Sequence, residues 1–240
     1  MNLSQKAWQN YVKKLKKIND TAAETMQKAI DRYGMEDRDK LIETAYFIAG
    51  KYGAASAALN AAMYDAIAQL EGVVVPAAEM ADLATYSEVA KAVNGTLKTG
   101  NEKIVSNSVG ALVKRTGADT MLKNAIRDRA EFAWIPAGDT CAFCLALASN
   151  GWRTASKEVL KGNHAEHIHA NCDCTFAVRF DSNSKIEGYK PEQYREVYDN
   201  AEGNSSVDKI NSIRRMQYQE NREKILEQKK AAYEARKDKS

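Results

Sequence analysis

Residues 132–152 read FAWIPAGDTCAFCLALASNGW, and residues 169–174 read HANCDC. The two segments contain all four cysteines of the chain, and its three histidines all lie between positions 164 and 169. The N-terminus does not have the pattern of a secretory signal peptide, so paired disulfides are disfavoured. Clustering of every cysteine beside every histidine instead predicts a metal site.

Cys141 and Cys144 supply the first half of the predicted site. The sequence predicts a short helix here, capped by Asp139 or Thr140 and reaching about Ser149. Thiols three residues apart on a helix point the same way, and the exposed amides of a helix N-terminus favour the thiolate form that metals bind. We therefore expect both thiols to share the first turn of this helix.

The second half of the site precedes an apolar alternation at 175–180 that predicts a strand. Zinc takes four ligands from thiolate and imidazole. Five candidates compete for these four positions, with His164 and His167 as extras: Cys141, Cys144, His169, Cys172 and Cys174. A set with His169 and one of the last two cysteines is as reasonable as an all-cysteine set, so the membership stays open.

The zinc ion is expected to be structural. Closing such a site contributes on the order of 10 kcal/mol to folding, which a small, strand-poor domain otherwise struggles to obtain. A catalytic zinc keeps an open coordination position beside a general acid or base, and Glu166 is the only local candidate for that role. We therefore expect no enzyme, and the less favoured alternative is a zinc hydrolase or nuclease that uses Glu166.

Residues 1–130 are predicted to form an elongated helical module. Apolar residues recur at three- and four-residue steps from Leu3 to Tyr33, which predicts an amphipathic helix ending at Gly34. A second helix is predicted from a cap at Asp37 to Gly72. Shorter helices are expected at about 77–93, 101–115 and 118–130, punctuated by Gly95, Gly100 and Gly117.

The predicted fold class is mainly α, with a small α+β zinc-knuckle domain at 131–182 and a helical C-terminal extension at 183–240. In that extension, Pro191 starts a short helix, and Ser205 with Asp208 resembles a capping box that opens a final helix. The formal net charge of +3 is too small to argue for nucleic acid by itself. No stretch has the ~20 apolar residues that a membrane span needs.

The CAFC and HANCDC segments, followed by EGY at 187–189, closely resemble the MuF-like minor capsid (head morphogenesis) proteins of tailed phages. That family has a CxFC segment, then HxxCxC and commonly an EGY-type continuation, and this chain has each part in order. The resemblance covers about 130–200. This chain departs from the family pattern at Asp173, where a basic residue is frequent, and at Ile168, where an aromatic residue is usual. Neither change removes a ligand.

The resemblance implies a structural, low-copy component of the capsid interior, assembled in the host cytoplasm near the portal and sometimes travelling with DNA during ejection. The implied partners are the portal and other capsid proteins, with phage DNA a further candidate for the basic helices. The oligomeric state is not indicated. A zinc-stabilised nucleic-acid-binding module is the main alternative, and a hydrolase that uses Glu166 is the weaker one.

Overall fold

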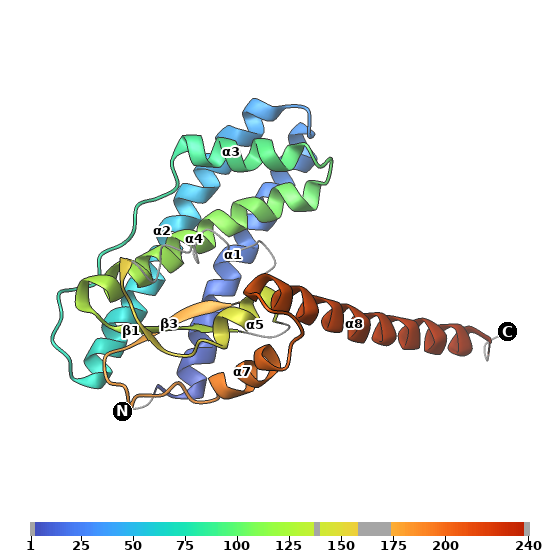
Figure 1. Ribbon diagram of the computed structural model, residues 1–240. Coiled ribbons are helices and arrows are strands. Elements are labelled where there is room, and N and C mark those ends of the chain that lie inside the picture. Colours follow the sequence, from blue (N-terminus) through green and yellow to red (C-terminus); the bar gives the residue numbers. More distant parts are fainter. Residues whose placement is uncertain (1–2, 137–139, 158–173, 238–240) are drawn as a thin grey trace. The chain divides into compact units, whose positions relative to one another are not determined.

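The computed structural model describes residues 3–136, 140–157 and 174–237, without the side chains of 228, 229 and 231–237. The described chain is mainly helical with a small antiparallel sheet, as predicted (Figure 1). It divides into two compact units, each described by itself: Met1–Gly138 with Trp152–Tyr189, and Asp139–Gly151 with Lys190–Ser240. The predicted domain boundaries at 130 and 182 stay predictions, because a compact unit need not fold independently.

The first unit contains four helices: α1 (Gln5–Tyr33), α2 (Arg38–Glu71), α3 (Tyr86–Leu97) and α4 (Glu102–Asp128). The predicted ends of the first two helices are confirmed. The Asp37 side chain caps α2, and the helices stop at Gly34 and Gly72, whose φ angles are 76° and 71°. A positive φ costs glycine little because it has no Cβ, so both residues terminate a helix without strain.

The core of the first unit lies where α1, α2 and α4 pack against one another (Figure 1). Met26 of α1 and Leu41 of α2 are fully buried there, and α3 adds Val89 and Val93. These positions follow the three- and four-residue spacing that places apolar side chains on one helix face. Burial of that shared face is what stabilises four amphipathic helices as one body.

Gly117 does not interrupt a helix, so the predicted break there is wrong: α4 runs unbroken through it. A Cβ at position 117 would lie 2.5 Å from Asn60 Nδ2 and closer still to Ser56 Oγ, both on α2. Asn60 cannot easily move away, because its Oδ1 accepts a 2.7 Å hydrogen bond from Tyr11. Burial raises the pKa of the Tyr11 hydroxyl, which keeps this donor protonated. The glycine therefore permits close packing of α2 and α4.

The Gly117→Ala substitution is expected to lower the free energy of unfolding by about 1–3 kcal/mol, because overpacking forces the helices apart. Gly50→Ala is the matched control: it also lies inside α2, and a Cβ there would meet no atom within 4 Å. That change is expected to stabilise the protein by about 0.5–1 kcal/mol through helix propensity. Urea unfolding measures both, and equal effects would show that Gly117 is not a packing residue.

Residues 73–85 form neither helix nor strand, so the predicted helix at 77–93 is corrected to a helix that begins at Tyr86. A reciprocal capping box between Thr85 and Glu88 fixes that start. Side chains of α2 and α4 hold the backbone of the 73–85 segment. Asp65 of α2 accepts a hydrogen bond from Ala78 N (2.8 Å), and Thr120 Oγ1 of α4 accepts one from Ala81 N (3.0 Å). Also on α4, Asn124 bonds both backbone groups of Glu79, and Arg127 donates to the carbonyls of Pro76 and Ala77. Tertiary hydrogen bonds thus replace helical ones.

The sheet of the first unit has the order β2-β1-β3: β1 (Glu131–Ile135), β2 (Arg153–Thr154) and β3 (Thr175–Arg179). Both pairings are antiparallel, and the predicted strand at 175–180 is confirmed as β3. Trp134 lies directly opposite Phe176, and their rings meet edge to face with centroids 4.2 Å apart. Such a pair adds stabilisation beyond the area that it buries.

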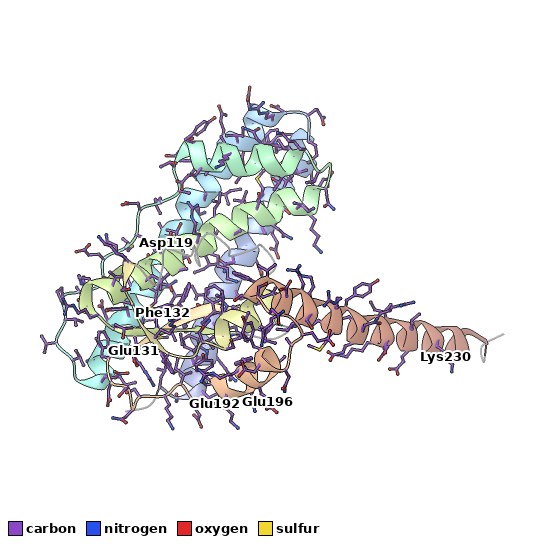
Figure 2. The ribbon with its side chains drawn as sticks, viewed as in Figure 1. Asp119, Glu131, Phe132, Glu192, Glu196 and Lys230 are labelled. Atoms are coloured by element: carbon purple, nitrogen blue, oxygen red, sulfur yellow. The ribbon has the colours of Figure 1, made fainter. Side chains whose placement is uncertain are left out.

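The second unit contains α5 (Ala142–Ala148), α7 (Pro191–Asp199) and α8 (Ser206–Lys237). Leu145 of α5 and Ile213 of α8 share its small core. The predicted Ser205–Asp208 capping box is present, and its hydrogen bonds lower the pKa of Asp208. Further along α8, residues 218–227 are exposed, and so is Lys230, which is labelled in Figure 2. No described helix is both long and apolar enough to cross a membrane.

Candidate metal centre

Cys141 and Cys144 lie at the start of α5, as the sequence predicts. The cap differs from the prediction, because Cys141 itself, rather than Asp139 or Thr140, is the N-cap residue. Its extended backbone, with φ −67° and ψ 156°, lets Sγ accept a hydrogen bond from Cys144 N at 3.4 Å. The CxxC spacing therefore places one sulfur at the cap and the other three residues into the helix.

The cysteine pair is held in place by the rest of the second unit. Cys144 is only 1% exposed. Arg195 of α7 donates from Nε to Ser149 O at 3.2 Å, and Gln217 of α8 donates from Nε2 to Thr140 O at 2.7 Å. These two bonds fix the backbone just before and just after α5. Sequence reasoning missed both donors, because a single polar residue on an amphipathic helix gives no signal of what it contacts.

Cys174 belongs to the first unit and lies immediately before β3. It is 2% exposed, and the next residue, Thr175, pairs with Ile135 of β1. The predicted candidates His169 and Cys172, together with Glu166, lie outside the described residues. Within the described part of the chain no three His, Cys, Asp or Glu side chains form a possible metal site. The zinc site and the choice of ligands therefore stay predictions.

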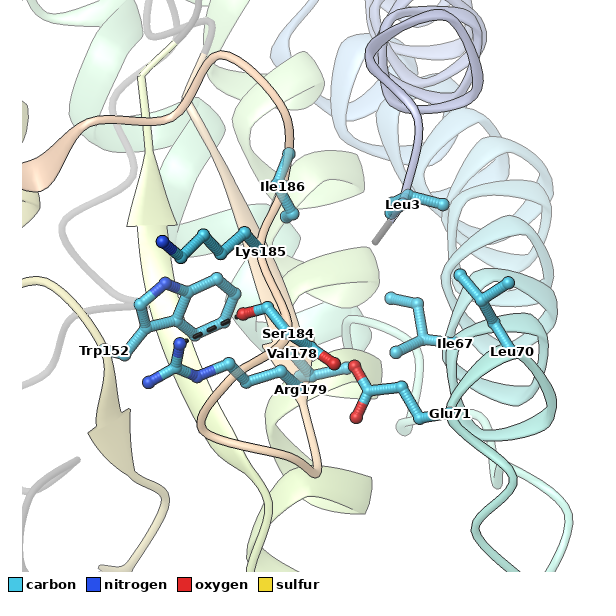
Figure 3. A pocket seen from close by; sticks show the side chains of 10 residues that line it. All are labelled: Leu3, Ile67, Leu70, Glu71, Trp152, Val178, Arg179, Ser184, Lys185 and Ile186. Atoms are coloured by element: carbon cyan, nitrogen blue, oxygen red, sulfur yellow. Dashed lines mark hydrogen bonds between the residues drawn. The ribbon is translucent and has the colours of Figure 1, made fainter. Parts of the chain in front are cut away.

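The first unit also contains a small pocket (Figure 3). It offers about 10 Å³, the room of about one water molecule. Arg179 is one of the residues that line it. The guanidinium is 4.6 Å from the Trp152 ring centroid, its Nε donates to Glu131 at 2.6 Å, and one terminal nitrogen donates to Ser184 O at 3.0 Å. Because these contacts are all made to residues of the same unit, Arg179 links Trp152 to the sheet.

The wall of this pocket also carries Glu71, the last residue of α2. Its Oε2 accepts from two consecutive amides, Phe180 N at 2.7 Å and Asp181 N at 2.8 Å. The carboxylate thus satisfies the turn that follows β3 and joins that turn to the end of α2. Charged side chains around the pocket are therefore used to position β3, the strand that Cys174 precedes.

The model of the VG15 protein family matches residues 2–201, which include all five predicted ligands. Neither the curated proteins nor the solved structures contain a match to this chain. VG15 is a viral gene protein family, which indicates a phage protein, and it does not by itself establish the MuF-like resemblance. Because the match spans most of its length, this chain belongs to the VG15 protein family.

Proposed function

We propose that this chain is a structural minor capsid protein of a tailed phage, an internal head component that acts in head assembly near the portal. The observation that carries the proposal is the VG15 match over residues 2–201. The matched range includes CAFC at 141–144 and HANCDC at 169–174. These are the segments that resemble the MuF-like minor capsid proteins. The virion is accordingly the proposed location.

The form of α8 supports a role in assembly. Its first turns are anchored in the second unit, where Ile213 is 1% exposed. Beyond Met216 the helix keeps apolar side chains at its surface, and Tyr218 is 67% and Leu226 54% exposed. Residues eight positions apart lie on one face of a helix, so Tyr218 and Leu226 form an exposed apolar strip of the kind at which a partner can dock. Portal and other capsid proteins are the proposed partners, with phage DNA as a further candidate for the basic helices.

We further propose that one structural zinc ion stabilises the fold, bound by four of the five predicted ligands. Cys144 and Cys174 fit this role in type and burial, because both thiols are almost completely buried, while Cys141 is partly exposed. In a closed structural zinc site four protein ligands fill every coordination position, so no water binds the metal. When bound, zinc supplies cross-linking rather than chemistry, and no catalytic residue is part of the proposal.

A phage that carries a stop codon in this gene tests the proposed function. We expect few infectious particles, and full rescue when the wild-type chain is supplied from a plasmid. Glu166→Gln is expected to rescue as well as the wild type, whereas Cys144→Ser is expected to fail. If the Glu166→Gln protein folds stably but does not rescue infectivity, the result would favour the zinc hydrolase instead. Normal yields of infectious particles without the gene would contradict a role in head assembly.

A further inference from the structure

The Trp134 indole has a buried hydrogen-bond donor that the described residues leave unsatisfied. The side chain is 3% exposed, and Nε1 has no hydrogen-bond partner among the described residues. Buried polar groups in native proteins nearly always have a partner, since an unpaired donor carries its full desolvation cost. Phenylalanine would fill an apolar position in β1 without that cost. The indole N–H therefore indicates an acceptor that forms when the site is complete.

The register of the sheet points to the position of that acceptor. Trp134 is directly opposite Phe176, and directly opposed residues share one face of an antiparallel pair. Cys174 is two residues before Phe176, with the strand residue Thr175 between them. Side chains on either side of an extended residue point to the same face. Trp134, Phe176 and Cys174 are thus expected to share a face, with Cys174 on the diagonal that a long aromatic side chain can reach.

We propose that the Trp134 indole N–H donates a hydrogen bond to the sulfur of Cys174 when that sulfur binds zinc, which makes Trp134 a positioning residue for the metal. This inference rests on the zinc site in the proposed function. A metal-bound thiolate is a better acceptor than a thiol because it keeps negative charge, and outer donors of this kind orient ligands and tune the site. The edge-to-face contact with Phe176 holds the indole in a fixed orientation for that bond.

NMR of the full-length protein loaded with ¹¹³Cd in place of zinc tests the bond directly. The three tryptophans give three indole N–H signals, assigned with single Trp→Phe variants. We expect a scalar coupling between ¹¹³Cd and the Trp134 indole proton, and a nuclear Overhauser effect from that proton to the Cys174 β-protons. A cadmium-loaded protein whose Trp134 signal shows neither effect would overturn the inference, and so would a signal that shows only exchange with water.

The affinity for zinc gives a second readout. Trp134→Phe keeps the aromatic packing and is expected to weaken zinc binding about 10-fold, at the lower end of the effect of outer-sphere substitutions. Trp152→Phe is the matched control, because Trp152 packs against Arg179 and Tyr189, and it should change the affinity less than 2-fold. Equal affinities of both variants would overturn the role of Trp134. If the wild type binds no metal, the zinc proposal fails first and this inference with it. If Trp134→Phe does not fold, the wild-type NMR result decides.

Discussion

Replacement of Cys144 by serine is expected to remove bound zinc and to lower the free energy of unfolding by several kcal/mol, up to the amount on the order of 10 kcal/mol that closing the site contributes. Structural zinc couples its binding energy to folding, and a serine hydroxyl is not a zinc ligand at neutral pH. The position is sensitive for a second reason, since Cys144 is 1% exposed and its neighbour Leu145 packs in the core of the second unit. Elemental analysis measures the metal, and urea unfolding measures the stability.

A chelator separates these two reasons. The wild type should lose stability when zinc is removed, and Cys144→Ser should not respond, because it has no metal to lose. Zinc analysis of variants in which Cys141, His169, Cys172 or Cys174 is replaced identifies the ligands. The protein should keep its zinc when the replaced residue is the candidate that does not bind the metal. A wild-type protein that is fully folded and contains no zinc would contradict the metal proposal.

The Asn124→Ala substitution is expected to lower the free energy of unfolding by about 2–4 kcal/mol. The Asn124 side chain is fully buried, accepts from Glu79 N at 2.9 Å and donates to Glu79 O at 2.8 Å, and donates also to Thr120 O at 2.7 Å. Alanine would leave both backbone groups of Glu79 without their partner. Hydrogen exchange should show loss of protection at residues 78–81, the part of the 73–85 segment whose amides donate to side chains of α2 and α4.

Lys123→Ala is the matched control for this prediction. Lys123 precedes Asn124 and contacts the same residue through an ion pair with Glu79 at 3.1 Å. The side chains of Lys123 and Glu79 are both about half exposed, so their ion pair should contribute less than about 1 kcal/mol to the stability. If the two substitutions destabilise the protein equally, the buried amide is not what holds the 73–85 segment.

The long helices of the first unit were predictable because their signals are local. Apolar spacing and the glycines at 34 and 72 set two helix ends, and Asp37 set a start. The Ser205–Asp208 capping box is equally local and was found in the same way. In each case the residues that decide the boundary lie within a few positions of it, so one sequence contains the whole signal.

The non-helical segment at 73–85 and the unbroken α4 were not predictable, because distant residues decide them. Residues 77–85 have helical spacing, and it is Asn124 and Thr120, about 40 positions away, that take their backbone groups. Gly117 has the local signature of a helix break, yet its use is to admit Ser56 and Asn60 from α2. Tertiary packing overrides local propensity at both places.

At the candidate site, the CxxC segment predicted the start of α5, and the apolar alternation at 175–180 predicted the strand after Cys174. It did not predict Cys141 as the cap residue, because sulfur is a weak acceptor and oxygen side chains preceded it in the sequence. Arg195 and Gln217 gave no signal either, since each acts on a backbone carbonyl far along the chain. The residue types of a site can be seen in a sequence, whereas the groups that position them require the fold.

The proposed role in the phage head is tested most directly by quantitative mass spectrometry of purified, nuclease-treated phage particles. The proposal predicts that peptides of this chain are present at low copy in mature heads and also in heads separated from tails. Peptides that occur only in infected-cell lysate, at normal abundance and absent from every particle fraction, would contradict it.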